Sequence, residues 1–172
     1  LLGGLLWERK DLPAEISIAR LFRDRIIATG RGGVVIGMYE RRTGKTVWEA
    51  SQESIPGPVV WLEPVEKGIL VGGLDNTGSP REGWVGLLDA ESGKRIWIDE
   101  ELPGPACRGC LTDAGVVVGG FEWGRQVRPG IWAIESIWIS LYSLDGKKVW
   151  ETRIPAELFI SVSFISMRES KG

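Results

Sequence analysis

Cys107 and Cys110 are the one pair of residues in this sequence with the type and spacing of a reactive site. Two cysteines separated by two residues can form a redox disulfide or supply part of a zinc site. A redox pair needs a helix N-terminus to lower the thiol pKa, whereas these cysteines fall on a predicted strand. Residues three apart on a strand point to opposite faces, so the spacing favours two buried free thiols.

Histidine is absent from the 172 residues, which limits the chemistry that the chain can perform. The commonest general base near neutral pH and the middle member of a Ser-His-Asp triad are both missing. The two cysteines supply half of a four-ligand zinc site, and no histidine can complete it. The sequence therefore predicts no metal site and no enzyme.

Aromatic and charged side chains gather instead in two predicted loops, 74–83 and 122–136. Exposed indoles beside arginines suit a sugar, peptide or protein surface, through stacking and charge-assisted hydrogen bonds. The alternative is that Trp123 and Trp132 only anchor a long loop. The candidate ligand-binding or partner-binding residues are Asp75, Asn76, Arg81, Trp84, Trp123, Arg125, Arg128 and Trp132.

A repeated phrase defines the framework that positions these residues. Its copies at 39–48, 88–97 and 142–150 each contain an apolar residue, a polar stretch, a Gly-Lys turn and a Trp. A truncated copy opens the chain, and it is recognised because 7–16 echoes 150–158. The four tryptophans are 41, 49 and 53 residues apart. These periods are close to the roughly 40–50 residues of a four-stranded propeller blade.

Runs of β-branched residues between turn residues divide each period into four strands. The predicted strands are 16–22, 25–29, 34–39 and 46–50, then 59–62, 68–73, 84–89 and 95–99, then 107–111, 116–121, 137–144 and 148–152. No window has a sustained helical period. The predicted fold class is all-β, a β-propeller of four-stranded antiparallel blades with three complete blades and two flanking strands.

Each phrase places a glycine where a tight hairpin needs a positive φ, at Gly44, Gly93 and Gly146. Asp145-Gly146 fits a two-residue type I′ turn, and the other two copies fit a longer loop with a glycine bulge. A Trp follows each glycine by four residues, on the outermost strand of its blade. Its indole can cover the gap to the next blade and donate to a backbone carbonyl. The predicted blade-docking residues are therefore Trp7, Trp48, Trp97 and Trp150, with the three glycines.

The phrase resembles the repeat of the quinoprotein family, the PQQ-like β-propellers, whose blades carry an Ala-x-Asp-x-x-Thr-Gly-x-x-x-Trp docking motif. Thr43-Gly44 with Trp48 matches this motif, as does 88–97. The resemblance implies this architecture over nearly the whole chain. The same repeat builds alcohol dehydrogenases, an outer-membrane assembly lipoprotein and many surface proteins, so it implies no single function.

The resemblance does not extend to the dehydrogenase site. Those enzymes carry a disulfide between adjacent cysteines over the quinone, whereas Arg108 and Gly109 separate the two cysteines here. Their calcium ligands are acidic and amide side chains, and no Asp, Glu and Asn cluster recurs at ligand spacing. Neither PQQ nor calcium is therefore expected as a cofactor.

The composition gives little indication of a nucleic-acid or membrane partner. The formal charge is -2 with acids and bases interspersed, so no electrostatic argument favours nucleic acid. No apolar run approaches the roughly 20 residues of a membrane helix, and residues 1–7 lack the basic region of a signal peptide. The first residue is Leu, which indicates a processed chain or a piece of a longer one. Relatives by resemblance are often extracytoplasmic or at the cell surface.

Three blades cannot close a ring, since propellers close with roughly four to eight. The chain is interpreted as one partial propeller domain, 1–172, with repeats at 1–12, 13–54, 55–101, 102–153 and 154–172. Strands at 5–9 and 158–166 would belong to incomplete blades, and unpaired edges of this kind self-associate.

The sequence therefore predicts a non-catalytic scaffold for protein interaction or assembly, which completes its ring with another chain or a longer parent. One alternative is a sensor that binds a carbohydrate or small ligand through the long loops between second and third strands. A second alternative is a degenerate quinoprotein dehydrogenase fragment.

Overall fold

The computed structural model describes residues 7–8, 10, 16–30, 35–50, 54–74, 82–128 and 131–156, apart from the side chains of Arg128 and Ile131. These residues form strands and turns and contain no helix. The strands are β1 (Ile16–Phe22), β2 (Arg25–Gly30), β3 (Ile36–Glu40), β4 (Thr46–Ala50), β5 (Val59–Val65), β6 (Gly68–Leu74), β7 (Gly83–Leu88), β8 (Arg95–Asp99), β9 (Ala106–Thr112), β10 (Gly115–Arg128), β11 (Ile131–Tyr142) and β12 (Lys148–Pro155).

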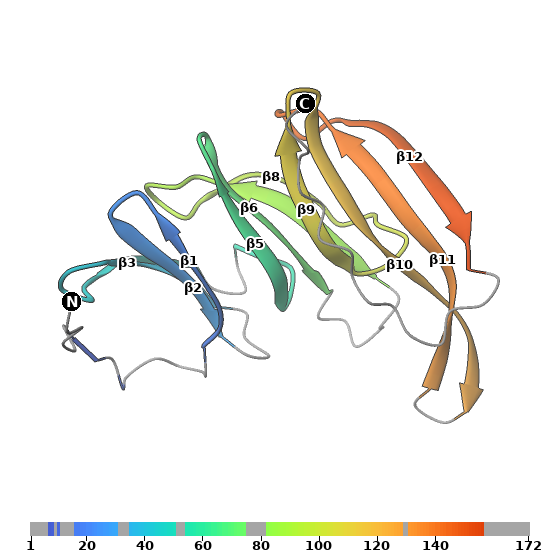
Figure 1. Cartoon of the computed structure of the whole chain (residues 1–172), viewed down its shortest axis with the longest axis horizontal. Helices are drawn as coiled ribbons and strands as arrows, with labels where there is room; N and C mark the ends of the chain where they lie inside the picture. The colour runs from blue at the N-terminus through green and yellow to red at the C-terminus, as the bar shows by residue number, and fades with distance from the viewer. Residues whose placement is uncertain are drawn as a thin grey trace, which may run out of the picture.

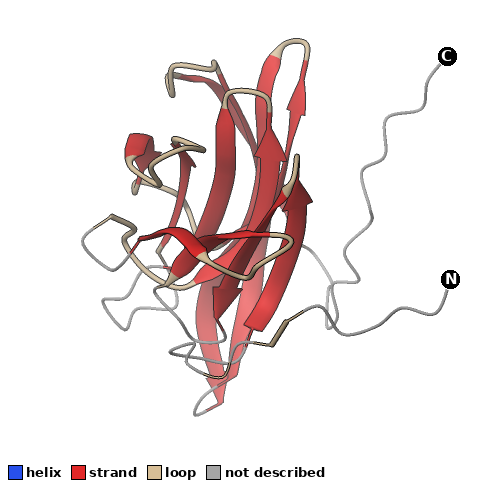
Figure 2. Cartoon of the chain, turned by 90° about the vertical axis from the view of Figure 1, so that its left-hand side faces the viewer, coloured by secondary structure: helices blue, strands red, loops and turns tan. Residues whose placement is uncertain are grey.

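The strands form three antiparallel sheets, β1–β4, β5–β8 and β9–β12, and in each sheet neighbours in sequence are neighbours in space. Short hairpins permit this order, because an antiparallel pair can be joined by a few residues. The sheets lie side by side along the molecule and do not close into a ring (Figure 1). The side view shows strands throughout the described structure (Figure 2).

The middle sheet is buried on both faces. All six residues of β7 are buried, and six of the seven residues of β6 are buried. Side chains alternate between the faces of a strand, so continuous burial requires a neighbouring sheet on each side. One core cluster joins the first and second sheets around Met38, Trp48 and Trp84, and a second joins the second and third sheets around Leu87 and Trp138.

The predicted loop at 122–136 is wrong. The structure continues β10 to Arg128 and starts β11 at Ile131, so this segment is a hairpin that extends beyond the rest of the third sheet (Figure 1). We call residues 122–128 and 131–135 the arm. Its strand pairing shifts at three places, beginning between Glu122 and Trp123. The β-forming aromatic and branched residues of the arm outweigh its glycine and polar residues, which had indicated a loop.

The predicted flanking strands have no described counterpart. In the segment 5–9 only residues 7 and 8 are described, and they lie in no strand. The segment 158–166 lies outside the described residues. No helix in the described ranges is long and apolar enough to cross a membrane.

Candidate docking interface

A hairpin with a left-handed glycine connects the third and fourth strands of each sheet. The φ angles are 69° at Gly44, 69° at Gly93 and 88° at Gly146. The Gly44 N–H donates to Glu40 O at 2.9 Å, and the Gly93 N–H donates to Asp89 O at 2.8 Å. Glycine suits these positions because a Cβ atom disfavours positive φ.

The third hairpin differs from its predicted type. The Gly146 N–H donates to Ser143 O at 3.0 Å, so the turn has Leu144 and Asp145 at its centre. A type I′ turn needs positive φ at both Asp145 and Gly146, but of these two residues only Gly146 has it. The type I′ prediction is therefore wrong. Gly146 follows the turn as a bulge residue. Gly44 and Gly93 have the same position at the end of their longer hairpin loops.

Three indoles lie on these glycines. The Trp48 Nε1–H donates to Ala90 O at 3.0 Å, and a Cβ atom added to Gly93 would lie 2.5 Å from the Trp48 ring. The Trp97 Nε1–H donates to Leu144 O at 3.1 Å, with its ring equally close to Gly146. Trp48 and Trp97, each on the outer strand of its sheet, therefore pack on the glycine hairpin of the next sheet. We call this arrangement the Trp–hairpin contact.

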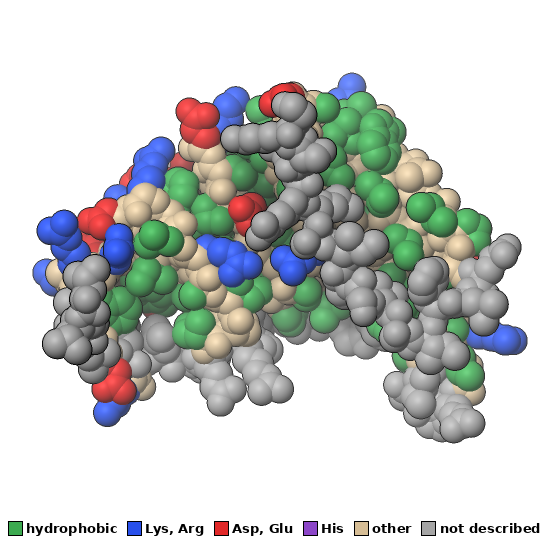
Figure 3. Space-filling view, viewed as in Figure 1, with side chains coloured by type: hydrophobic (Ala, Val, Ile, Leu, Met, Phe, Trp, Pro, Cys, Tyr) green, Lys and Arg blue, Asp and Glu red, His purple; other side chains and the backbone are tan. Residues whose placement is uncertain are grey.

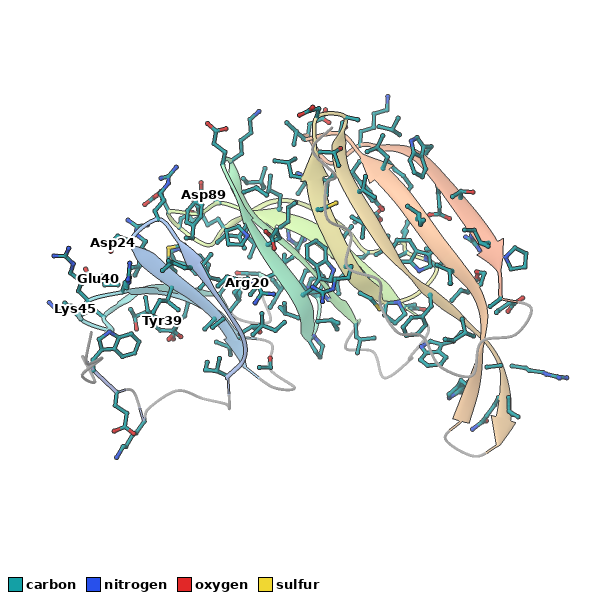
Figure 4. The ribbon with its side chains drawn as sticks, in the orientation of Figure 1. Arg20, Asp24, Tyr39, Glu40, Lys45 and Asp89 are labelled. Atoms are coloured by element: carbon teal, nitrogen blue, oxygen red, sulfur yellow. The ribbon has the colours of Figure 1, made fainter. Side chains whose placement is uncertain are left out.

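The first hairpin makes the same contact with the N-terminal segment. The Trp7 Nε1–H donates to Arg41 O at 2.7 Å, and a Cβ atom added to Gly44 would lie 2.7 Å from the Trp7 ring. Tyr39 lies at the hairpin end of the first sheet with Glu40 and Lys45 (Figure 4). The Tyr39 hydroxyl donates to Glu49 Oε1 at 3.1 Å. Trp7 therefore occupies the Gly44 hairpin of the first sheet in the same way that Trp48 occupies the Gly93 hairpin.

Trp150 is the one Trp of the repeat without such a contact among the described residues. Its side chain is 44% exposed, against 8% for Trp48. Leu141 lies opposite Trp150 in the β11–β12 pairing, and Val117 lies opposite Leu141 in the β10–β11 pairing. The corresponding row in the first sheet is Ile27, Met38 and Trp48, whose side chains are all buried by the second sheet.

The same face of the third sheet carries further apolar residues. Ile139 lies opposite Thr152, and Ile137 lies opposite Ile154, which is 52% exposed. Hydrophobic side chains gather over the third sheet in the space-filling view (Figure 3). We call the side that carries Trp150 the open face, which consists of Val117, Ile137, Ile139, Leu141, Trp150, Thr152 and Ile154. Trp150, Thr152 and Ile154 are exposed, Val117, Ile137 and Ile139 are partly buried, and Leu141 is buried.

A polar cluster joins the second and third sheets beside the Trp97 contact. The Tyr142 hydroxyl donates to Asp99 Oδ2 at 2.7 Å, and Trp97 stacks on Tyr142 with ring centroids 5.7 Å apart. Lys148 Nζ lies 3.3 Å from Asp99 Oδ2. Partial burial acts to raise the pKa of Asp99, but hydrogen bonds from Tyr142 and Glu101 and the charge of Lys148 outweigh it and lower the pKa. Asp99 is therefore paired with both Tyr142 and Lys148 across the joint.

The structure corrects one predicted binding residue. Trp84 lies in β7 with its side chain fully buried, and its Nε1–H donates to Leu74 O at 2.9 Å. Trp84 is therefore a core residue, because the face of β7 that carries it packs against the first sheet. Asp75, Asn76 and Arg81 lie outside the described residues.

The other predicted binding residues lie on the arm. Trp123 is partly buried and meets Phe121 edge-on, with ring centroids 4.6 Å apart. Trp132 is also partly buried, and Arg125 is exposed. Arg128 belongs to β10, but its side chain is not described. The arm therefore brings Trp123, Arg125 and Trp132 onto two paired strands rather than into a loop.

Cys107 and Cys110 are partly buried and form no disulfide with each other. The Cys107 thiol lies 3.6 Å from Pro105 O. Burial raises the pKa of the Cys107 thiol to about 12, despite the nearby positive charge of Arg108. Within the described ranges no group of three or more Cys, Asp or Glu side chains could hold a metal ion.

Solved structures resemble this arrangement of sheets. Quinohemoprotein alcohol dehydrogenase ADHIIG from Pseudomonas putida HK5 matches with a TM-score of 0.56 and 15% identity over 78% of this chain. The fold is a partial quinoprotein-like β-propeller. This chain spans about 20% of the length of that dehydrogenase chain. The predicted fold class is thereby confirmed, and the three sheets are its blades.

Two computationally designed proteins also have structures similar to this chain. The computationally designed Ika4 protein has a TM-score of 0.54 and 13% identity, over 90% of this chain and 99% of Ika4. The computationally designed Ika8 protein has a TM-score of 0.51 and 10% identity, over 86% of this chain and 52% of Ika8. The sequence matches no protein-family model and no curated protein. At these identities the likeness is one of fold alone.

Proposed function

We propose that this chain is a non-catalytic propeller scaffold that binds a protein partner through the open face of its third blade. The exposure of Trp150 carries this proposal. Trp48 and Trp97 each pack on the hairpin of the next blade, whereas Trp150 has no such hairpin among the described residues. An exposed Trp in an apolar setting is typical of the energetic centre of a protein interface.

The shape and chemistry of the open face favour a protein over a small ligand. Val117, Leu141 and Trp150 form one row across three strands of a sheet. The equivalent rows of the other two blades are covered by the neighbouring blade. A protein surface of this sheet type therefore complements such a row. A sheet covers such a face with interdigitating side chains over a broad area, which a small molecule cannot do.

The described ionisable groups support a non-catalytic role. A cysteine with a thiol pKa of about 12 is protonated near neutral pH, so Cys107 is a poor nucleophile. The Glu122 and Glu151 carboxylates are both engaged by Arg153, at 3.2 Å and 3.1 Å. With no histidine in the sequence, the chain also lacks the usual proton-transfer residue near neutral pH.

Site-specific photo-cross-linking in cells that produce the protein tests the proposed interface. A benzophenone amino acid at Thr152 places the probe on the open face, and the same probe at Ile96 serves as the matched control on the second blade. We expect adducts with protein from position 152 that are lost when Trp150→Ala is added. Equal adducts from both positions, or none from position 152, would contradict the proposal.

Thermal unfolding with added PQQ and calcium tests the absence of quinoprotein chemistry. We expect the melting temperature to stay unchanged, because the family's adjacent-cysteine pair is not present in this sequence. A saturable rise in the melting temperature would instead indicate a cofactor site, because a ligand that binds only the folded state stabilises it.

A further inference from the structure

Building on the proposed function, we infer that the open face binds the first blade of a second copy of this chain. In this arrangement Trp150 of one copy makes the Trp–hairpin contact on Gly44 and Arg41 O of the next copy. The copies therefore associate head to tail.

The sequence after Trp150 identifies the blade that this Trp fits. Trp150-Glu151 is followed by Pro155-Ala156-Glu157, and Trp7-Glu8 is followed by Pro13-Ala14-Glu15. The junctions after the other two tryptophans read 55–58 Ile-Pro-Gly-Pro and 102–105 Leu-Pro-Gly-Pro. The Pro-Ala-Glu junction precedes the first blade, and the Pro-Gly-Pro junction precedes the second and third blades. Trp150 therefore carries the junction that belongs with the first blade.

The hairpin surface of the first blade has the chemistry to receive the third blade. In the second joint, Trp97 packs on Gly146 and stacks on Tyr142. The first blade offers the same pair of residue types, because Tyr39 lies five residues before Gly44 and Tyr142 lies four residues before Gly146. The second blade has Leu88 in place of this tyrosine.

The residue two positions after Trp150 is also suited to a contact with the first blade. Two residues beyond Trp97, Asp99 accepts the hydrogen bond of the Tyr142 hydroxyl across the joint. The residue two positions beyond Trp150 is Thr152, and its hydroxyl can donate a hydrogen bond to the Tyr39 hydroxyl oxygen of a second copy, while the Tyr39 O–H remains bonded to Glu49.

Leu21, an exposed apolar residue of the first blade, extends the surface that would be covered. Leu21 is 58% exposed and lies opposite Ile26, which lies opposite Tyr39. These three side chains therefore share the face that carries the Gly44 hairpin. A complete third blade would cover this row, and its apolar open face would be covered in turn.

The second copy must displace Trp7, which now occupies the Gly44 hairpin. Trp7 is partly buried and bonds to Arg41 O through its indole. Trp150 offers the same indole contact together with the adjoining row of Leu141 and Val117. The exchange therefore replaces one Trp–hairpin contact with another and adds the burial of a sheet face.

Sedimentation velocity over a range of concentrations tests self-association of the full chain. We expect the mass of the wild type to rise with concentration, and Trp150→Ala to weaken the association by roughly tenfold or more. Val149→Ala is the matched control. Val149 is 56% exposed, and its equivalents Val47 and Ile96 stay exposed beside tryptophans that are in contact. The control should associate like the wild type.

A mixing experiment tests the head-to-tail direction. Gly44→Asn keeps a residue that tolerates positive φ but fills the space where the indole lies. Trp150→Ala and Gly44→Asn should each fail to associate alone. A mixture should form a one-to-one dimer, because one variant retains the open face and the other retains the hairpin. A symmetric contact would give no dimer on mixing and would overturn the head-to-tail arrangement.

Trp7→Ala provides a variant that should strengthen association, because it vacates the Gly44 hairpin. A several-fold tighter association is expected. A monomeric mass at every concentration for both the wild type and Trp7→Ala would overturn the second-copy inference. If the adducts from position 152 and their loss with Trp150→Ala persist in that case, the proposed function stands with another protein as partner. Loss of those adducts would overturn both.

Discussion

The joints between blades depend on pairs of residues whose side chains complement each other. An indole packs where a glycine has no Cβ atom, as Trp48 does on Gly93 and Trp97 does on Gly146. The indole N–H then donates to a carbonyl of the same hairpin. In the second joint an ionised carboxylate, Asp99, adds a hydrogen bond from Tyr142. Charge-assisted hydrogen bonds of this kind are stronger than neutral ones, so the second joint should respond to pH.

Asp99→Asn should remove a pH-dependent part of the stability. The pKa of Asp99 is lowered in the folded chain, so its stabilising effect is complete above the unfolded pKa and is lost as pH falls through the folded pKa. We expect the free energy of unfolding of wild type and Asp99→Asn to differ most near pH 7. The difference should shrink below about pH 4. Urea denaturation across this range measures it, and a difference independent of pH would contradict the assignment.

At the scale of the elements, the arm lies outside the cores between blades, and it contacts the rest of the third blade at its base, where Glu122 pairs with Arg153 and Glu135 O accepts from Ala156 N–H. Neither of the two core clusters includes a residue of the arm. The ninth and twelfth strands do not run beside it, since β9 pairs with β10 only as far as Gly120 and β12 ends opposite Ser136. The arm is therefore a two-stranded ribbon, which is marginally stable by itself and depends on the third blade for its position.

Shortening the arm should leave the blades intact. Replacing residues 125–132 with Asn-Gly would join Gly124 to Ala133 through a tight hairpin turn. We expect the free energy of unfolding to change by less than about 1 kcal/mol, because the removed residues belong to neither core cluster. Chemical denaturation measures this change. A loss above about 2 kcal/mol would show that Trp132 anchors the blade. Oligosaccharide binding that disappears with the arm would support the carbohydrate function considered from the sequence.

The whole molecule is a row of three blades with one core cluster in each joint. Trp48 belongs to the cluster between the first and second blades, and Trp97 packs against the cluster between the second and third. Repeat structures of this kind gain stability mainly from contacts between neighbours. The third blade has a row of apolar residues at the equivalent positions, Val117, Leu141 and Trp150, but no described blade packs against it. Within the described structure its open face therefore lacks the neighbouring blade that covers the other two rows.

Alanine substitutions in the two joints should destabilise independently. Trp48→Ala should cost about 3 kcal/mol or more, as expected for a buried Trp. Trp97→Ala should also destabilise, and the double variant should equal the sum within about 0.5 kcal/mol, because the joints lie in separate clusters. Trp150→Ala should cost less than about 1 kcal/mol at a concentration where the chain is monomeric. Equal costs for Trp48→Ala and Trp150→Ala would contradict the exposure of Trp150.

The sequence by itself determined where the glycine hairpins lie and most of the strand pattern. β1, β4 and β8 have their predicted bounds, because alternation and turn glycines act over a few residues and are visible in the chain. The spacing of Gly93 and Trp97 also follows from one hairpin. These features depend on local conformation, which the residue types largely decide.

The tertiary structure decided which side chains of these strands and hairpins are buried and which strands pair. Trp84 was expected at a binding surface, yet a neighbouring blade buries it. The arm was expected as a loop, yet pairing between β10 and β11 continues through it. Tyr142 and Asp99 are 43 residues apart and meet only because two blades pack together. The exposure of Trp150 has the same origin, since burial depends on whether another sheet covers the face, and the residue type alone does not specify that.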